Sequence, residues 1–197
     1  MQNIIVAISG ASGAPYAVRL LQILVEKQCK VHLTISRSAA LVLNHEMDIK
    51  VDLRKFSAKS LIGKATKQIS YHYYDDITAP IASGTFPVDA MVIIPCSMST
   101  LAGVASGLGT NLILRAAEVT LKERRPLILV PRETPLGVIE IENMLRAARA
   151  GACILPAMPA FYQGPKTLND MVDFVVGKVL NQLRIPHELF RKWSGVE

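Results

Sequence analysis

Short continuous apolar runs alternate along the chain with segments whose apolar residues recur at helical spacing, and this order constrains the fold most. The first run, residues 3–9, is typical of a parallel strand covered on both faces. Further strands are predicted at residues 31–35, 90–94, 127–130 and 154–155. Helices are predicted around residues 18–25 and 41–43, and at residues 112–124, 139–150 and 168–183. The alternation predicts an α/β fold in which a doubly wound parallel sheet lies between two helical layers.

The chain is expected to form a single domain, residues 1–197, because it has the length of one domain and contains no linker, repeat or low-complexity run. Residues 48–74 are polar and show no clear period. The chain opens on a strand pattern, and no apolar run approaches the roughly 18 residues of a membrane span. We therefore expect a soluble, cytoplasmic protein with no membrane association.

The amino-acid composition indicates that the protein assembles into an oligomer. Charged residues make up 19% of the chain, against roughly 25% in a typical globular protein, and the apolar share is 50%. One core of this size cannot bury so much apolar surface, so we expect large subunit interfaces in a homo-oligomer. The net charge of +6 is scattered and has no aromatic stacking platform beside it, which argues against nucleic acid and favours an anionic small molecule.

Ligands of doubly wound sheets bind at the carboxyl ends of the strands, so the loops there are the candidate site. The first is Gly10-Ala11-Ser12-Gly13, whose glycines permit a tight turn before a helix that Pro15 suits in its first turn. A helix N-terminus offers N–H groups and a positive dipole end to an anion, although a plain strand-to-helix turn would look the same. After the second strand, Ser36-Arg37-Ser38 stands where a site for NAD would carry an acidic residue. Hydroxyls and a cation suit a phosphate or a ribityl chain better than they suit the ribose of NAD.

Two further loops carry polar groups. Pro95-Cys96-Ser97-Met98-Ser99-Thr100 follows the third strand, and its hydroxyls can cap a helix, donate to a ligand, or both, while Met98 fits a core position at least as well as a ring contact. After the fourth strand, Pro131-Arg132-Glu133-Thr134-Pro135 holds a charged pair between two prolines that restrict the backbone. Upstream, Lys122-Glu123-Arg124-Arg125 is either part of the site or a solvated helix C-terminus. Pro156-Ala157-Met158-Pro159-Ala160-Phe161-Tyr162 bears aromatic rings that suit packing equally well.

Taken together, these motifs resemble the flavin prenyltransferase (UbiX-like) family over nearly the whole chain. Each motif alone is weak evidence for the family, but the joint occurrence of the motifs in this order is specific to it. Besides the loops above, the resemblance is carried by Arg115-Ala116-Ala117-Glu118, Leu121-Lys122-Glu123-Arg124-Arg125-Pro126-Leu127, Pro159-Ala160-Phe161-Tyr162 and Arg191-Lys192-Trp193.

The resemblance implies a flavodoxin/Rossmann-like fold and a metal-independent transfer of a dimethylallyl group from dimethylallyl monophosphate to N5 and C6 of reduced FMN. It implies FMN contacts from Gly10, Ala11, Ser12, Ser36, Ser97, Met98, Ser99, Thr100 and Arg115. It places Lys122, Arg132, Glu133, Tyr162 and Lys178 around the prenyl phosphate, with Glu46 nearby and Trp193 closing the pocket. The family carries an Arg at the Lys178 position, and a Lys there keeps the charge but loses the bidentate fork. The implied catalytic set is Ser12, Glu46, Lys122, Arg132 and Glu133.

The resemblance further implies that the product, prenylated FMN, serves a partner decarboxylase, and that the protein is a homo-oligomer like the dodecamers of the family. No metal is expected, because prenyl transferases that use magnesium need clustered aspartates. The one aspartate pair, Asp75-Asp76, suits a turn instead. Fixed cations would stabilise the charge that builds on the departing phosphate. Glu133 or the released phosphate would accept the proton lost on ring closure.

Two alternatives stay open. One is a flavin-dependent decarboxylase of the same fold, like phosphopantothenoylcysteine decarboxylase. Such enzymes use a catalytic His and an Asn-bearing loop where this chain has Ser-Met-Ser-Thr, and none of His32, His45, His72 and His187 lies in a matching motif. The other is a non-catalytic carrier that delivers FMN, which turnover of dimethylallyl phosphate would separate from an enzyme.

Overall fold

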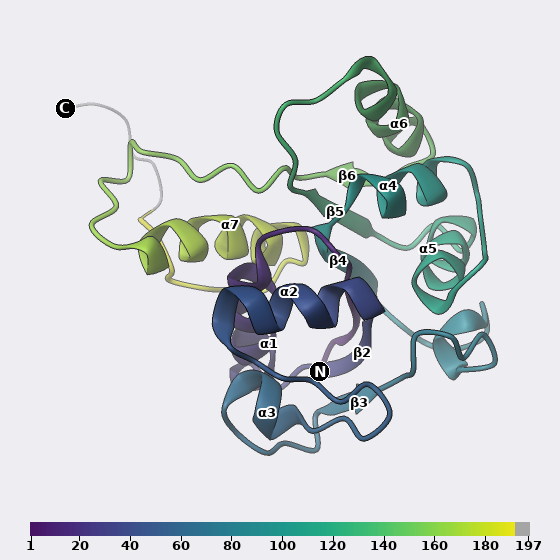
Figure 1. Ribbon diagram of the computed structural model, residues 1–197, viewed down its shortest axis with the longest axis horizontal. Helices are drawn as coiled ribbons and strands as arrows, with labels where there is room; N and C mark the ends of the chain where they lie inside the picture. Colours follow the sequence, from purple (N-terminus) through teal and green to yellow (C-terminus); the bar gives the residue numbers. More distant parts are fainter. Residues whose placement is uncertain (192–197) are drawn as a thin grey trace.

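The computed structural model describes residues 1–191, in which six parallel strands form one sheet in the order β3-β2-β1-β4-β5-β6 (Figure 1). This confirms the predicted doubly wound, three-layer architecture. The strands are β1 (Asn3–Ile8), β2 (Lys30–Ile35), β3 (Ile69–Tyr71), β4 (Ala90–Cys96), β5 (Leu127–Pro131) and β6 (Cys153–Ile154).

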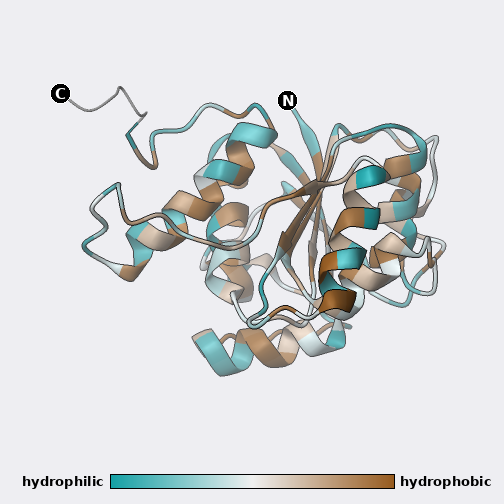
Figure 2. Ribbon diagram, turned by 90° about the horizontal axis from the view of Figure 1, so that it is seen from above, coloured by the Kyte–Doolittle hydropathy of each residue, from teal (hydrophilic) through white to brown (hydrophobic). Residues whose placement is uncertain are grey.

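Helices cover both faces of the sheet (Figure 2). Residues of α1 (Ala14–Glu26), α2 (Arg37–Met47), α3 (Ala58–Ile62) and α7 (Leu168–Gln182) pack into the core on one face. The short 3-10 helix η1 (Pro80–Ala82) and helices α4 (Met98–Ala105), α5 (Leu112–Lys122) and α6 (Val138–Arg149) pack into the core on the other. No helix among residues 1–191 is long and apolar enough to cross a membrane.

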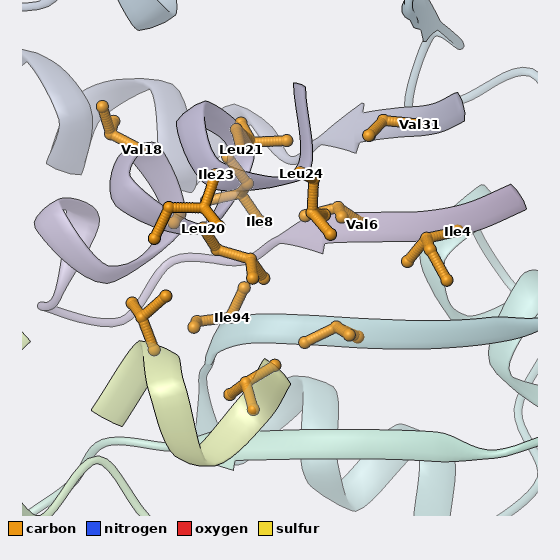
Figure 3. Packing of buried hydrophobic residues seen from close by; sticks show 14 of the residues in the cluster. Ile4, Val6, Ile8, Val18, Leu20, Leu21, Ile23, Leu24, Val31 and Ile94 are labelled. Atoms are coloured by element: carbon orange, nitrogen blue, oxygen red, sulfur yellow. The ribbon is translucent and has the colours of Figure 1, made fainter. Parts of the chain in front are cut away.

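The central strands supply apolar side chains to both cores, which explains their unbroken apolar runs. Ile4, Val6 and Ile8 of β1 point into the first core, whereas Ile5 and Ala7 point into the second. Figure 3 shows side chains of α1 beside those of β1 and β4 in the first core. Each fully buried leucine or isoleucine there contributes about 2 kcal/mol relative to an exposed one.

The structure differs from the sequence prediction in residues 48–74, which contain α3 and β3. β3 is a three-residue edge strand whose side chains are half-buried or exposed, so it lacks the apolar pattern that marks the central strands. Helix α5 ends at Lys122, two residues earlier than predicted, because Arg124 adopts a left-handed conformation with φ of 54°.

The direction of winding reverses between β1 and β4. β2 lies on one side of β1 and β4 on the other, and the chain reaches β4 only after completing the β2 and β3 half of the sheet. The carboxyl ends of β1 and β4 therefore flank the switch point, where doubly wound sheets bind ligands. The loops that begin at Ser9 and Ser97 stand at this point.

Candidate functional site

The loop that follows β1 lies in direct contact with the first turn of α2. A Cβ atom on Gly10 would stand 2.2 Å from the hydroxyl oxygen of Ser38, so only glycine lets this loop approach the helix so closely. The hydroxyl oxygen of Ser36 accepts the N–H of Ala39 at 3.0 Å, which caps α2, and lies 3.1 Å from that of Ser38. Ser36 is buried, and its hydroxyl already has hydrogen-bond partners within the protein. Its predicted contact with FMN stays a prediction.

The loop after β4 is tied to the end of β1. The Ser9 hydroxyl donates to the carbonyl of Pro95 at 2.9 Å and accepts the N–H of Ser97 at 2.8 Å. The Ser97 hydroxyl accepts the N–H of Thr100 at 3.3 Å and lies 3.0 Å from its hydroxyl, so the predicted cap of α4 is confirmed. Ser99 is exposed, while Met98 packs partly against the second core.

Glu46, on the last turn of α2, occupies the N-terminus of α1. Its carboxylate accepts the N–H of Gly13 at 2.9 Å and that of Ala14 at 2.8 Å. These are N–H groups that have no partner within the helix, at the positive end of the helix dipole. The helix end that the sequence offers to an anionic ligand is therefore occupied by a carboxylate of the protein.

The surroundings of Glu46 keep its carboxyl group ionised. Burial raises its pKa, but the Ser12 hydroxyl, the N–H groups of Gly13 and Ala14 and the charge of Arg132 outweigh burial, so the pKa lies below its ordinary value. Glu46 is an acceptor that orients its neighbours, and at neutral pH it has no proton to give.

Arg132 joins the same group from the carboxyl end of β5. Its Nε donates to the backbone carbonyl of Ser12 at 3.1 Å, across 120 residues of sequence. The predicted site residues Ser12, Glu46 and Arg132 thus come together in one chain. They line a cavity of about 340 Å³, named here the Arg132 cavity, together with Gly13, Pro15, Tyr16, Ala157, Pro159, Leu168, Met171 and Val172.

Tyr16 is a wall of this cavity that the sequence analysis missed. Its ring covers Gly13, whose φ of 122° suits glycine, so that a Cβ there would stand 2.9 Å from Cδ2 of the ring. Burial raises the pKa of Tyr16, while the charges of Arg132 and Glu46 act on it in opposite directions. An aromatic residue in the first turn after a glycine-rich loop was the signal available in the sequence.

Lys122 lies elsewhere in the chain. It ends α5 beside the amino end of β5, and its ammonium group stands 4.0 Å from Glu123. Arg132 follows the carboxyl end of the same strand, whose five residues at about 3.3 Å each span roughly 16 Å. The fold of one chain therefore does not bring Lys122 to the Arg132 cavity.

Arg115 stands in the first turn of α5, which begins where the N–H of Leu112 donates to the carbonyl of Tyr74. Its Nε donates to the carbonyl of Ala82 at 3.3 Å, and its guanidinium pairs with Glu118 at 2.9 Å. Arg115 thus holds the loop around η1 against α5. Its predicted contact with FMN stays a prediction.

The remaining predicted residues are dispersed. Tyr162 packs edge-to-face on Phe174, with ring centroids 6.0 Å apart, and Lys178 lines a separate cavity of about 280 Å³ beside the same Phe174. Glu133 is exposed directly after Arg132 and accepts the N–H of Thr134. Trp193 lies outside the described residues.

Comparison with known proteins decides the family. A family model described as Flavoprotein matches residues 1–180. A flavin prenyltransferase UbiX of Halalkalibacterium halodurans is 52% identical over 189 residues, which cover 96% of this chain and 92% of the relative. The chain belongs to the flavin prenyltransferase (UbiX-like) family. The resemblance carried by the sequence motifs is thereby confirmed.

Solved structures of UbiX-like proteins share the fold over the full length. AnUbiX (PadA1), in complex with FMN and dimethylallyl pyrophosphate, superposes with a TM-score of 0.89 at 38% identity, covering 100% of this chain and 99% of that one. A dodecameric FMN-dependent UbiX-like decarboxylase from Escherichia coli O157:H7 gives 0.88 at 42% identity, covering 98% and 100%.

The switch point of this UbiX-like chain fits a flavin phosphate and its ribityl chain. The loop at Gly10 and the N-terminus of α4 are brought together there by the Ser9 bridge to Pro95 and Ser97, and the exposed Ser99 hydroxyl stands in the first turn of α4. Polar groups of these types bind phosphates and hydroxyls, so the residues present suit FMN.

Proposed function

We propose that this protein transfers a dimethylallyl group from dimethylallyl monophosphate to reduced FMN and releases phosphate. The observation that carries the proposal is the meeting of Ser12, Glu46 and Arg132 around one cavity at the carboxyl edge of the sheet. The 52% identity to a flavin prenyltransferase and the ligands of the AnUbiX structure support it.

The flavin is proposed to lie at the switch point, against Gly10, Ala11 and residues 97–100, with Ser36 and Arg115 at its ends. Reduced FMN supplies two nucleophilic positions, N5 and C6. The carbon–oxygen bond to phosphate would break as the carbon–nitrogen bond to N5 forms, and N5 would lose its proton. Ring closure would add a proton to the remaining carbon–carbon double bond as C6 bonds to the prenyl group, and C6 would then lose its own proton, so that one proton is released overall. Glu133, or the phosphate set free in the first step, is proposed to accept that proton.

Arg132 is proposed to stabilise the charge that builds on the departing phosphate. A guanidinium has five N–H donors in a fixed fork, and the Nε donor of Arg132 is held by the Ser12 carbonyl. That contact fixes the direction of the charge before the reaction begins, which is what electrostatic stabilisation of a transition state requires. Glu46, through the Ser12 hydroxyl and the α1 N-terminus, holds the loop on which Arg132 rests.

Lys122 can take part only from another copy of the chain, since it lies at the opposite end of β5. Assembly is supported by the apolar side chains that α6 exposes, Val138, Ile139, Ile141 and Leu145, and by the dodecameric relative. We propose a homo-oligomer, a dodecamer by resemblance, in which one subunit brings Lys122 to the phosphate site of its neighbour. Tyr162 and Lys178 are proposed to border the same composite site.

The decisive test is anaerobic incubation of the protein with reduced FMN and dimethylallyl monophosphate, followed by mass spectrometry of the flavin. The flavin should gain the mass of one isoprene unit and phosphate should appear in equal amount. Activity should survive EDTA and gain nothing from magnesium, since protein cations hold the phosphate. If FMN binds but its mass stays unchanged, the protein would be a non-catalytic FMN carrier instead.

The product is proposed to serve a partner decarboxylase. Adding the reaction mixture to an apo-decarboxylase of the prenylated-flavin class should restore its activity, and FMN alone should not. A direct decarboxylase remains the second candidate because the Escherichia coli relative, 42% identical, is described as a UbiX-like decarboxylase.

A further inference from the structure

The first turns of α7 form one wall of the Arg132 cavity but are weakly held by the core. Leu168, Met171 and Val172 line the cavity together with Ser12 and Arg132. The buried side chains of α7 begin only at Phe174, and the residues before it are half-buried or exposed. Of these three residues only Val172 packs, half-buried, against the first core, so packing defines the position of this wall less tightly than that of the buried half of α7.

A bidentate ion pair ties this wall to α1. Nε of Arg19 donates to one carboxylate oxygen of Asp173 at 2.6 Å, and a terminal nitrogen of its guanidinium donates to the other at 3.1 Å. A second cavity of about 340 Å³ lies at the pair and shares Pro15 and Val172 with the Arg132 cavity. The pair thus stands directly behind the wall.

The exposure of the pair indicates what it does. The side chains of Arg19 and Asp173 are 35% and 21% exposed, and ion pairs this open to water contribute only about 0–1 kcal/mol to stability. Two parallel hydrogen bonds do, however, define both the distance and the angle between the groups they join. The pair therefore acts on the placement of α7 more than on the stability of the fold.

We propose that Arg19 and Asp173 are positioning residues that set the width of the Arg132 cavity and thereby its preference for a five-carbon allyl group. This inference rests on the proposed function. With the pair intact, Met171 and Val172 stand close to the Ser12 loop and limit the length of the apolar group. Without it, α7 can swing outward about its buried half, and the cavity widens.

The test uses Asp173→Asn and Arg19→Lys, each of which keeps the size of its side chain and loses the bidentate pairing. Asp52→Asn is the matched control, since Asp52 is exposed and bonds only its own turn. Three quantities are measured: the exchange of the amides of residues 172–175, the dissociation constant of FMN, and kcat/KM with dimethylallyl and with geranyl monophosphate.

Both variants should lower kcat/KM for dimethylallyl monophosphate about tenfold, mainly through KM, because a shift of the order of an ångström is costly in a positioned site. The ratio of kcat/KM for geranyl over dimethylallyl monophosphate should rise, and the amides of residues 172–175 should exchange faster. FMN affinity and the melting temperature should stay near wild type.

An unchanged substrate ratio with faster amide exchange would show that the pair is structural only and overturn the inference. A parallel loss of FMN affinity would overturn it too, because the pair would then act on the whole fold. If the wild-type protein neither binds nor converts dimethylallyl monophosphate, the proposed function fails, and this inference fails with it.

Discussion

The carboxylate of Glu46 lies 2.9 Å from the backbone nitrogen of Gly13, although 33 residues separate them in the chain. The contact fills the N-terminus of α1 with a negative charge and also engages the Ser12 hydroxyl. One side chain thus shapes the loop on which Arg132 rests.

Replacement of Glu46 by Ala should reduce both activity and stability. The loss of a side-chain acceptor at a helix N-terminus costs about 1 kcal/mol in the free energy of unfolding. Because the pKa of Glu46 is lowered in the fold, its stabilising contribution is present above the ordinary value of 4.5 and is lost as the pH falls through the folded pKa. Urea titrations at pH 7 and near pH 3 check this, and a difference between variant and wild type that stays constant with pH would contradict it.

Replacement of Lys122 by Ala should cut prenyl transfer about a hundredfold, or about 3 kcal/mol in the transition state, while FMN affinity stays intact. Equal losses in flavin binding and turnover would mark Lys122 as a cofactor or structural residue.

The separation of Lys122 and Arg132 along β5 permits a complementation experiment. Coexpressed Lys122→Ala and Arg132→Ala subunits should regain part of the activity that each lacks alone, because some sites in a mixed assembly would carry both native residues. Failure of the mixture to exceed the single variants would refute sharing of the site between subunits.

The protein should bind FMN and not NAD. Ser36 caps α2 at the end of β2, where a dinucleotide site would carry an acidic residue for the ribose hydroxyls. Fluorescence titration of the apoprotein with each cofactor checks this, and tighter binding of NAD would reject it.

Acid should destabilise the edge of the sheet through His32. Its Nδ1 lies 3.0 Å from Nε2 of His72, and the ring of Phe86 packs on it edge-on. Burial, with the charges of His72 and Lys30, lowers the pKa of His32 to about 4, and burial also lowers that of His72 against the charge of Asp76. Because the pKa of His32 is lowered in the fold, folding favours the neutral imidazole. The stability that depends on this neutral form is complete above the ordinary pKa of 6.5 and is lost as the pH falls toward 4.

The free energy of unfolding should therefore fall less between pH 7 and pH 4 in His32→Phe than in wild type. The expected difference is about 1 kcal/mol, a value reduced for the partial exposure of the pair. Replacement of the exposed His45 by Gln is the control and should leave the profile unchanged. A profile in the His32 variant that matches wild type would show that other groups cause the acid sensitivity.

The protein alone should release no carbon dioxide from a hydroxybenzoate or a cinnamate above background. Decarboxylation needs an electron sink for the developing carbanion, and the residues at the strand ends are hydroxyls, cations and carboxylates suited to holding phosphate and moving a proton. Gas release measured with FMN-loaded protein checks this. Sustained release in the absence of a partner would favour the decarboxylase alternative.

The sequence alone determined the architecture and the positions of the loops. Buried parallel strands show as apolar runs, helices show as a period of 3.6 residues, and caps such as Ser97 depend on residues three positions away. These signals are local, so they survive without knowledge of the fold. The same loops, taken together, carried the family resemblance.

Tertiary structure alone decided which of these residues meet. β3 escaped prediction because an edge strand of three residues, two half-buried and one exposed, has no apolar period. Glu46 reaches the α1 N-terminus, and Asp173 reaches Arg19 across 154 residues, only because α2 and α7 pack on the same face as α1. Lys122 lies far from Arg132 because the two residues flank the opposite ends of β5, and these ends lie at opposite edges of the sheet. Contacts between distant segments depend on how the elements pack, and local sequence patterns carry no record of that packing.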